Sequence, residues 1–539
     1  MSHTVKIGPT SSLSLFDFKD VVYHGKKVEI DANATPKLKR VRGFIDFILE
    51  KNFKVYGITT GFADLRSCSV SPDHASKLSE NIILSHDAAT GKPFEEEIVL
   101  GAMLLRAQSL AIGYSGFQLQ SLQTLVDMIN CKVIPVIPSI GSLGASGDLA
   151  TLARLGRAMQ GHDVAVVYQE KNMPADVALK KAGIRPFAPK AKEGLALTNG
   201  TSFMISMLSI AFLKEMQMLD NIFCQLAFVL NSSLAIDAAF ADTLHQARGQ
   251  KGQTDAARRI RALLEGSPFV DKTGVQQDYC VRCLPQIMGP KLEIILEQLP
   301  KITTELNAVT DNPLIFEGEA ISSDVSAERR IRYLNTDWAV LSGGNFHGEN
   351  ITTIADLITA ANAKIALTLE RQITYLLNPQ RNGGRLPTYL IAETEKAGLQ
   401  SGYMITQYTA NALAQKIATL ALPSQMFNLT SGNESEDVVS YGATACQRLL
   451  EQLELMSELN AIHLVCGSQS YGLARRGQEG LSKSLLVEKF FQAVQEESSG
   501  IYPTFEEDGF ETRYKAAARL LENNTLVKIN GDPLLQQTT

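Results

Sequence analysis

The stretch Gly141-Ser-Leu-Gly-Ala-Ser-Gly-Asp-Leu-Ala150 decides how the rest of this chain is interpreted. Its three glycines, spaced three residues apart, leave a loop with little side-chain bulk and wide backbone freedom. Asp148 then precedes an apolar run at residues 149–155, which predicts a helix whose N-terminus Asp148 caps. A glycine loop that leads into a helix N-terminus is typical of an anion-binding site.

The common phosphate-binding patterns do not fit this loop. The dinucleotide pattern G-x-G-x-x-G differs from the spacing found here, which is G-x-x-G-x-x-G. A P-loop would also need Gly-Lys-Ser/Thr, and no such sequence follows. The task of the loop therefore has to be inferred from the rest of the chain.

Composition favours a soluble protein with a large core. The 539 residues are 45% hydrophobic and 20% charged, and the net charge of −6 comes without any basic run, which excludes a nucleic-acid-binding surface. The N-terminus lacks the layout of a signal peptide, so we expect a cytoplasmic protein. Residues 194–213 carry no charge, and we interpret them as a buried helix after a polar turn and not as a membrane span.

The cysteines predict neither disulfides nor a metal site. Their number, seven, is odd, and they are scattered along the chain, as is typical of reduced cytosolic thiols. Cys280 and Cys283 form a single C-x-x-C with no second ligand pair nearby, so we expect no metal site.

Apolar residues at three- and four-residue intervals predict long helices. The predicted segments are residues 37–51, 75–85, 95–111, 148–160, 176–183, 203–219 and 443–465. One further helical face is formed by Ile351, Ile354, Ile358, Ala361, Ile365 and Leu369. Helices this apolar predict a large bundle shared between subunits.

We expect three regions along the chain. Residues 1–205 form an N-terminal region that carries the glycine loop, residues 206–480 form a central helical bundle, and residues 481–539 form a helical cap. Segments 496–500 and 505–508 in the cap are polar and predicted to be solvated. No internal repeat or proline-rich linker marks the boundaries.

Several loops between the helices are richer in polar and aromatic residues than a connection requires. They are residues 53–62, 85–91, 276–282, 310–314, 343–348 and 431–440. Each one alone has an ordinary explanation, such as a packing tyrosine, a structural histidine, a turn or a solvated helix edge.

Taken together, these loops and the glycine stretch resemble the aromatic amino acid ammonia-lyases and aminomutases, and most of all the histidine ammonia-lyases. In that family the Ala-Ser-Gly backbone, here Ala145, Ser146 and Gly147, cyclises and loses two waters. The product is 4-methylidene-imidazol-5-one (MIO), an electrophile, and no external cofactor is needed. The resemblance runs from Tyr56 to Ser440. It implies a mainly α fold with an elongated central helical bundle, as in the fumarase/aspartase-like superfamily, and a mixed N-terminal region carrying the MIO loop.

The resemblance gives the glycines a chemical task. Cyclisation requires the Gly147 nitrogen to reach the Ala145 carbonyl carbon, and flanking glycines permit that compressed backbone. Ser146 loses its hydroxyl in the process and does not act as a hydrolytic nucleophile. Asp148 is expected to assist this dehydration as well as to cap the following helix.

The resemblance also implies catalytic roles. Tyr56 is the base that removes the β-proton, and Tyr279 supports the electrophile and the proton relay. Arg282 holds the substrate carboxylate through a bidentate pair and helps, with backbone dipoles, to stabilise the phenolate of Tyr56.

Three further positions match family residues around the substrate. Asn199 and Gln276 are expected to hydrogen-bond the prosthetic group and the carboxylate end, and Phe346 to form a wall of the site. In the family each such site takes loops from more than one subunit of a homotetramer, which is the assembly expected here.

Side-chain recognition is implied for His86 and Glu436. Glu436 follows the histidine enzymes, because an acid accepts a hydrogen bond or a proton from an imidazole where an amide does not. The favoured substrate is therefore L-histidine, giving trans-urocanate and ammonia. A tyrosine or phenylalanine ammonia-lyase, or a 2,3-aminomutase, is the alternative, and nothing in the sequence separates a lyase from a mutase.

The sequence departs from the family pattern beside the expected pocket. Ser435 replaces the usual Gln, Val438 replaces a His, Thr59 replaces an Asn and Ala63 replaces a Gly. Gln277-Asp278 also replaces the usual Asp-Pro pair. These changes leave the substrate open more than the chemistry. A non-catalytic relative and a fumarase-type lyase remain as other readings, although neither accounts for an intact Ala-Ser-Gly.

Overall fold

The computed structural model describes residues 4–476, 482, 485–497 and 509–535. The chain divides into two compact units, each assembled from three separate segments. Unit 1 comprises residues 1–210, 299–355 and 424–447, and unit 2 comprises residues 211–298, 356–423 and 448–539. The predicted boundary at residues 205/206 stays a prediction. The boundary at 480/481 lies outside the described residues, as do part of the predicted polar segment 496–500 and all of segment 505–508.

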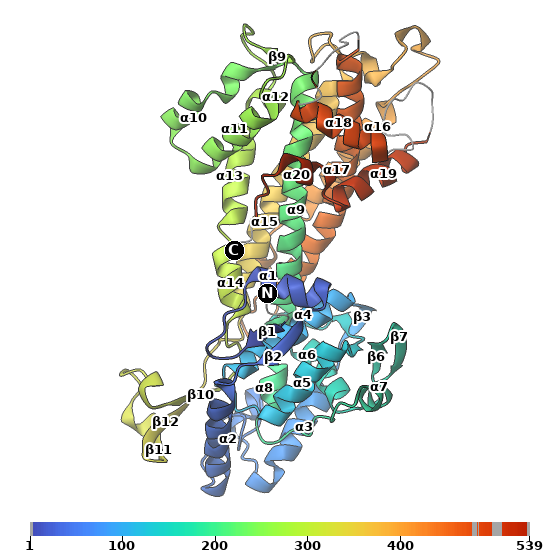
Figure 1. Ribbon diagram of the computed structural model, residues 1–539. Coiled ribbons are helices and arrows are strands. Elements are labelled where there is room, and N and C mark those ends of the chain that lie inside the picture. The colour runs from blue at the N-terminus through green and yellow to red at the C-terminus, as the bar shows by residue number, and fades with distance from the viewer. Residues whose placement is uncertain (1–3, 477–481, 483–484, 498–508, 536–539) are drawn as a thin grey trace. The chain divides into compact units, whose positions relative to one another are not determined.

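Unit 1 mixes helices with short strands (Figure 1). Its helices are α1 (Leu15–His24), α2 (Ala34–Glu50), α3 (Ala75–His86), α4 (Glu96–Ala111), α5 (Leu119–Cys131), α6 (Leu149–Met159), α7 (Ala175–Ala182), α8 (Glu193–Thr198) and α14 (Leu299–Leu306). Its strands are β1 (Thr4–Ile7), β2 (Lys27–Ile30), β3 (Thr90–Pro93), β4 (Ile134–Pro135), β5 (Pro138–Ile140), β6 (Ala165–Tyr168), β7 (Lys171–Pro174), β10 (Leu314–Glu317), β11 (Arg330–Tyr333) and β12 (Thr336–Leu341).

The strands of unit 1 form small separate sheets. β1 and β2 pair in parallel, β3 pairs with β5, and the two three-stranded sheets have the orders β4-β6-β7 and β10-β12-β11. The β3–β5 pair ends directly before the glycine loop, so it fixes where that loop begins.

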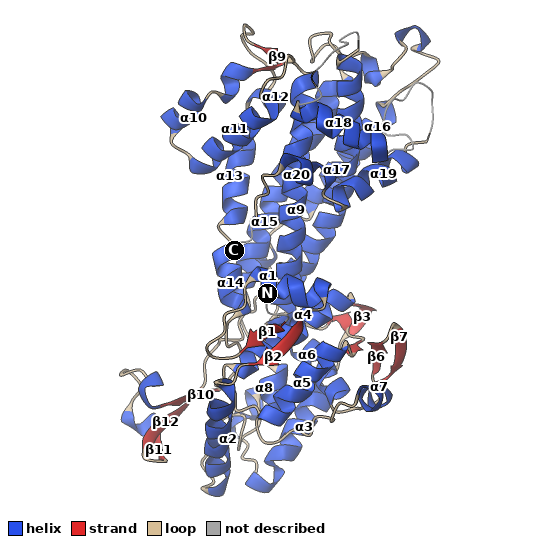
Figure 2. Cartoon of the chain, in the orientation of Figure 1, coloured by secondary structure: helices blue, strands red, loops and turns tan. Residues whose placement is uncertain are grey.

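Unit 2 is almost entirely helical, with one short parallel pair of strands, β8 (Ala235–Ile236) and β9 (Val270–Asp271) (Figure 2). Its helices are α10 (Asp242–Arg248), α11 (Lys251–Leu264), α12 (Tyr279–Arg282), α13 (Leu284–Leu296), α16 (Met404–Thr419), α18 (Leu486–Glu497), α19 (Glu511–Glu522) and α20 (Thr525–Asn530). Three long helices have residues in both units: α9 (Ser202–Ser232), α15 (Glu349–Leu377) and α17 (Gly442–Ala474). The predicted mainly α class, with a helical bundle and a mixed N-terminal region, is confirmed.

Helix α9 explains the charge-free stretch at residues 194–213. The stretch is not one helix after a turn, because α8 fills its first part and a turn at residues 199–201 separates α8 from α9. α9 is long and apolar enough to cross a membrane by composition alone, but 83% of its most apolar window is buried inside the protein. Burial within the chain therefore accounts for the apolarity of α9, and the predicted sharing of the bundle between subunits stays a prediction.

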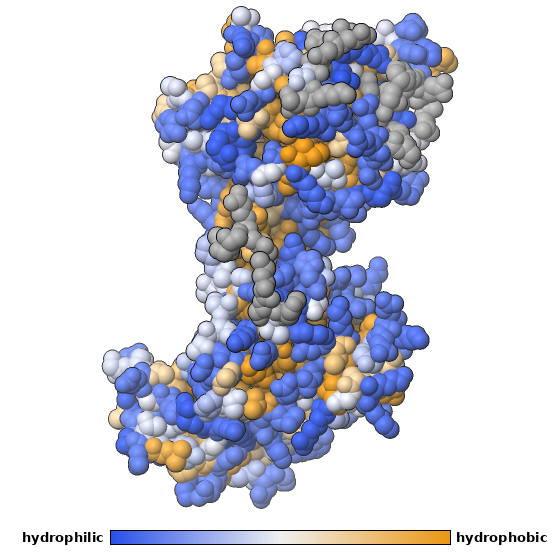
Figure 3. Space-filling view, viewed as in Figure 1, coloured by the Kyte–Doolittle hydropathy of each residue, from blue (hydrophilic) through white to orange (hydrophobic). Residues whose placement is uncertain are grey.

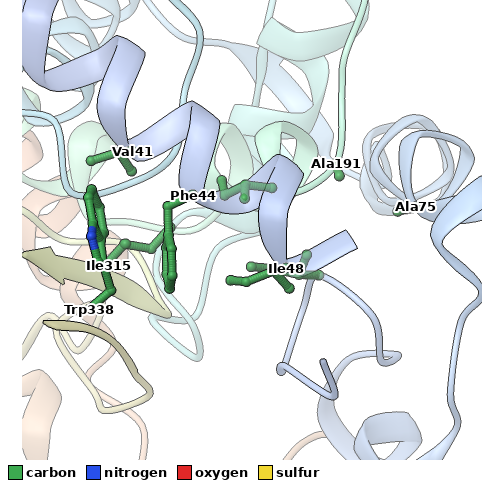
Figure 4. Close-up of a cluster of buried hydrophobic side chains, with 9 residues drawn as sticks. Val41, Phe44, Ile48, Ala75, Ala191, Ile315 and Trp338 are labelled. Carbon is green, nitrogen blue, oxygen red and sulfur yellow. The ribbon is translucent and has the colours of Figure 1, made fainter. Parts of the chain in front are cut away.

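One aromatic cluster fastens the β10–β12 sheet to α2 (Figure 4). Phe44 of α2 stacks on Trp338 of β12 at a ring distance of 4.6 Å, and Tyr333 packs edge-on against Trp338 at 5.8 Å. Aromatic pairs of this kind add to the hydrophobic stabilisation of a buried cluster. The outer face of each unit is mostly hydrophilic in the view of Figure 3, with smaller hydrophobic areas.

Candidate active site

The glycine loop holds a serine in the left-handed backbone region. Gly144, Ser146 and Gly147 have φ angles of 81°, 60° and 81°. This region is unfavourable for a serine, so the loop stores strain at Ser146. A Cβ at position 147 would lie 2.3 Å from the Gly200 carbonyl oxygen, so only glycine fits there. The close approach presses the loop against the turn between α8 and α9.

Asn199, in the turn between α8 and α9, holds the glycine loop through a hydrogen bond. Its Nδ2 donates to the Ser146 carbonyl oxygen at 2.6 Å, and its own carbonyl accepts a hydrogen bond from Arg106 Nη1 at 2.7 Å. Asn199 Oδ1 is buried and has no hydrogen-bond partner among the described residues. The predicted place of Asn199 next to the prosthetic group fits this geometry, because its amide holds Ser146, the central residue of Ala145-Ser146-Gly147.

Asp148 does not cap the helix that follows it, so that prediction is wrong. It occupies the N-cap position of α6, but its side chain makes no hydrogen bond to that helix. Instead Oδ2 accepts from the backbone N–H groups of Phe203 and Met204, at 2.8 and 3.1 Å, and Oδ1 accepts from Ser142 Oγ at 2.9 Å. These N–H groups belong to the first turn of α9, where backbone N–H groups have no hydrogen-bond acceptor within their own helix. Asp148 therefore caps α9.

Burial shapes the acidity of Asp148. The carboxyl is fully buried, which raises its pKa to about 6, although the hydrogen bonds from Met204, Ser142 and Phe203 oppose the shift. Near neutral pH the side chain is thus a carboxylate, and the positive end of the α9 helix dipole favours that charge.

Glu436 reaches the serine of the loop from far along the chain. Its Oε1 accepts from Ser146 Oγ at 3.1 Å and its Oε2 accepts from Ser431 Oγ at 2.6 Å. The loop that carries Glu436 is closed by a bridge between Ser431 and Glu436. The carboxylate is therefore held in one position directly beside the triad.

These residues line one cavity of about 660 Å³ within unit 1. The predicted site residues Tyr56, His86, Ser146, Asn199, Phe346 and Glu436 all line it. Its apolar walls come from Phe62, Ile82, Leu149 and Leu195. Polar and charged side chains, Lys54 and Arg66 among them, make up the rest of the lining, and a cavity of this size suits a small-molecule substrate.

Tyr56 and His86 approach the cavity from different elements. Tyr56 lies in the predicted loop, and the backbone N–H of Ala63 donates to its phenol oxygen at 3.2 Å. His86 ends α3, and its Nδ1 lies 3.0 Å from Ser85 Oγ. Burial lowers the pKa of His86, while the negative charge of Glu436 opposes the shift. The ring is therefore neutral near pH 7.

Asp87, the residue after His86, forms ion pairs with α6, the helix that follows the glycine loop. Its fully buried carboxylate lies 2.7 Å from Arg154 Nε and 2.6 Å from Arg157 Nη1, both on α6. The Arg157 contact is a charge-assisted hydrogen bond, and Arg154 adds a second positive charge beside the same buried acid.

The remaining predicted residues lie on a second cavity, of about 610 Å³, within unit 2. Gln276, Tyr279 and Arg282 line it, together with Arg371 and Arg381. Tyr279 and Arg282 share one face of α12, where the guanidinium lies 4.7 Å from the centre of the Tyr279 ring. Tyr279 is 68% exposed. The roles assigned to these residues, including help from Arg282 to Tyr56, stay predictions.

The departures from the family pattern differ in their position. Ser435 and Ala63 line the first cavity, whereas Val438 and Thr59 do not. The Thr59 hydroxyl is used within its own loop, where it donates to the Phe53 carbonyl at 2.7 Å. Of these four, Ser435 and Ala63 are therefore the ones placed to affect the substrate directly.

Sequence reasoning missed a buried charged group behind the loop. Lys192 and Asp311 form an ion pair of 3.0 Å with both side chains fully buried, and Ser115 also donates to Asp311. Arg106, equally buried, holds the turn at Asn199. The signal that could have found Arg106 is its place as the one arginine in the apolar run of α4, because a buried charge needs a partner.

The structure fits an MIO group built from its own residues. Ala145, Ser146 and Gly147 are all present, and Gly147 is packed where no side chain fits. Asn199 Nδ2 holds the Ser146 carbonyl, and the oxygen of the same amide is buried without a partner among the described residues. Among the described residues, no group of three or more His, Cys, Asp or Glu is arranged to hold a metal ion. The seven cysteines, all of them described, are free thiols.

Known proteins resemble this chain along nearly its whole length. Residues 13–496 match the family model described as "Aromatic amino acid lyase". A histidine ammonia-lyase from Natranaerobius thermophilus is 37% identical over 472 residues, covering 87% of this chain and 89% of that protein. In a crystal structure, a histidine ammonia-lyase from Trypanosoma cruzi is 29% identical, with a TM-score of 0.84. The match covers 99% of this chain and 96% of that chain. A tyrosine aminomutase from Streptomyces globisporus is 25% identical, with a TM-score of 0.86 and coverage of 99% of each chain.

Proposed function

The chain belongs to the aromatic amino acid lyase family and is a carbon–nitrogen lyase, and we propose that it converts L-histidine to trans-urocanate and ammonia. The observation that carries this proposal is the carboxylate of Glu436, which lines the same cavity as Tyr56 and His86 and contacts Ser146. A carboxylate accepts a hydrogen bond or a proton from an imidazole, and the ring of phenylalanine has neither to offer. The histidine ammonia-lyases among its relatives support the same substrate.

We propose that Ala145, Ser146 and Gly147 form the MIO group, held by Asn199 and by the Gly200 backbone. When formed, MIO supplies an electrophile for the substrate amine, which makes ammonia a better leaving group. The strained backbone at Ser146 lowers the cost of folding the chain back on itself.

Tyr56 is proposed as the base for the β-proton. The Ala63 N–H that donates to its phenol oxygen stabilises negative charge developing there. Leu195 and Phe346 supply surfaces on which the substrate ring packs.

Glu436 is proposed to recognise the imidazole. Loss of the Ser146 hydroxyl removes the partner of Oε1, whereas Ser431 continues to hold Oε2. One oxygen is then free to accept an imidazole N–H while the other fixes the orientation of the carboxylate. His86, neutral and near Glu436, offers a second polar contact to the substrate ring.

Tyr279, Arg282 and Gln276 are proposed to complete the site of a neighbouring subunit in a soluble, cytoplasmic homotetramer. They line a cavity of their own, and the exposed Tyr279 is stacked under Arg282 with its hydroxyl uncommitted to the core. A guanidinium offered in this way suits the carboxylate of an amino acid. An active monomer at high dilution would contradict this part of the proposal.

The test is a substrate panel. Purified protein is incubated separately with L-histidine, L-tyrosine and L-phenylalanine, and the unsaturated acid is followed by ultraviolet absorption. Urocanate from histidine is the expected product. Coumarate or cinnamate without urocanate would overturn the choice of substrate, and a β-amino acid in the product mixture would identify an aminomutase.

The role of Glu436 has its own variant. Glu436→Gln keeps the shape but removes the charge, so kcat/KM for histidine is expected to fall about 10- to 100-fold, the worth of a charge-assisted hydrogen bond. Val438→Ala is the matched control, because Val438 lies in the same loop but does not line the cavity. An equal loss in both variants would mean that the loop, and not the carboxylate, matters.

A further inference from the structure

The helix that carries Tyr279 and Arg282 is a single turn. α12 has four residues, too few for a helix to be stable by itself, because nucleation is unfavourable. Its conformation therefore depends on contacts from other elements. Asp278 at its N-cap pairs with Arg381 at 2.9 Å, and the Cys280 carbonyl accepts from Gln372 Nε2 at 2.9 Å.

Gln372 is the last member of a buried chain of side chains within unit 2. On α15, its Oε1 lies 2.8 Å from His463 Nε2 of α17. The other ring nitrogen, Nδ1, lies 3.0 Å from Gln225 Oε1 of α9, and the Gln225 amide is 2.8 Å from that of Asn460. All four side chains are buried, so water does not replace any of these contacts.

The donors in this chain can be assigned by elimination. Gln372 Nε2 is committed to the Cys280 carbonyl, so Gln372 Oε1 must face an N–H, which places the imidazole proton on His463 Nε2. Burial lowers the pKa of His463 to about 3, so the ring is neutral and Nδ1 is an acceptor. Nδ1 then requires an N–H from Gln225.

Flipping two side-chain amides, so that their nitrogen and oxygen atoms exchange places, completes this series of hydrogen bonds. The nitrogen and oxygen of an amide occupy equivalent positions, so rotating the Gln225 and Asn460 side chains supplies that N–H without moving any other atom. Asn460 then donates to Gln225, Gln225 to His463, His463 to Gln372, and Gln372 to the Cys280 carbonyl. Every donor points toward α12, and such aligned bonds strengthen one another.

We propose that His463 is a positioning residue for the lyase reaction, which through Gln372 fixes the Cys280 carbonyl and hence the turn that presents Tyr279 and Arg282. The proposal rests on the proposed function, in which those two side chains act on the substrate. His463 itself is fully buried and does not touch substrate.

The test compares His463→Leu with His463→Gln. Leucine removes the N–H, whereas glutamine keeps an amide nitrogen near the place of Nε2. His463→Leu is expected to raise KM about tenfold and to speed hydrogen exchange of the amides at residues 279–283 about tenfold, the worth of one buried hydrogen bond. His463→Gln is expected to restore most of both, while both variants still lose two waters from the intact mass.

Ser470→Ala is the matched control, because it removes a buried hydrogen bond between α17 and Ser232 of α9 that does not lead to α12. It should lower thermal stability without changing exchange at α12 or KM. Gln372→Met removes the last bond directly and serves if His463→Leu fails to fold, with the same expected changes.

Two results would overturn the proposal: unchanged exchange at α12 in a folded His463→Leu or Gln372→Met protein, or a His463→Gln variant as impaired as His463→Leu. Failure of the proposed function gives a different result. The wild-type protein would then turn over no aromatic amino acid, while the exchange comparison would still decide whether His463 positions α12.

Discussion

Asp148 links the glycine loop to the N-terminus of α9, and replacing it separates its capping role from its proposed role in MIO formation. Asp148→Ala leaves the N–H groups of Phe203 and Met204 without their acceptor in a fully buried place. Each unsatisfied buried donor costs about 1–3 kcal/mol, and the favourable interaction with the helix dipole is lost as well. Relief from burying a carboxylate, seen in its raised pKa, offsets part of this. We expect a net loss of about 3 kcal/mol of unfolding free energy.

Asp148→Asn retains an oxygen acceptor for α9 but cannot take up a proton. It is expected to lie within about 1 kcal/mol of the wild type, because the capping oxygen is the part that α9 needs. If Asp148 also handles protons during cyclisation, this folded variant will lack the two-water deficit in its intact mass.

The assays are urea unfolding at pH 8 and fixed protein concentration, followed by intact-protein mass spectrometry of each variant. Ser142→Ala is the control, since it removes one contact to Asp148 and leaves the cap intact. Wild-type stability of Asp148→Ala would refute the capping of α9. A full two-water deficit in Asp148→Asn, formed as fast as in the wild type, would refute the processing role and leave the cap standing.

Three further outcomes follow from buried charges. Burial raises the pKa of Glu215 from 4.5 to about 8. The free energy of unfolding should therefore fall by up to roughly 5 kcal/mol as the pH rises from 4.5 through 8. Glu215→Gln should flatten this pH dependence, as measured by urea unfolding at several pH values. Lys192→Met should lower the free energy of unfolding by about 3–5 kcal/mol, because it leaves the buried Asp311 carboxylate without its ion-pair partner. In a double-mutant cycle, adding Asp311→Asn should recover part of that loss. Simple additivity of the two single-variant losses would contradict a stabilising interaction between Lys192 and Asp311. Asp87→Asn should raise KM for histidine more than it lowers kcat, because Arg157 no longer anchors the segment after His86; a pure stability change with normal kinetics would contradict this.

The helices were predictable because hydrophobic periodicity is local. The segment 37–51 became α2 (Ala34–Glu50), 75–85 became α3 and 443–465 fell inside α17. The face at Ile351 through Leu369 is buried throughout, as its spacing predicts. Boundaries shifted by a few residues because caps and turns, not periodicity, set the ends.

Contacts between distant segments were not predictable. Asp148 has the ordinary sequence of a cap for α6, and nothing local shows that its carboxylate turns instead to α9, 55 residues later. The pairing of Lys192 with Asp311 spans 119 residues, and the division into two interleaved units depends on how α9, α15 and α17 pack. These features come from tertiary structure that no periodicity records.

The candidate site was predicted by its motifs and only partly by its chemistry. Motif order brought Tyr56, His86, Phe346 and Glu436 to one cavity, as expected from the resemblance. The burial of His86 and the contact by which Ser431 orients Glu436 were not predictable, because both depend on how the loops fold and pack.

The most direct test of the account is the intact mass of the wild-type protein beside that of Ser146→Ala. The strained loop at Ser146, held by Asn199 and pressed on Gly200, predicts a wild-type mass lower than that of its sequence by two waters. Ser146→Ala should show its full mass and almost no activity on histidine. A wild-type protein of full mass, or a Ser146→Ala variant that still releases ammonia at the wild-type rate, would contradict the claim that the loop becomes the catalytic group.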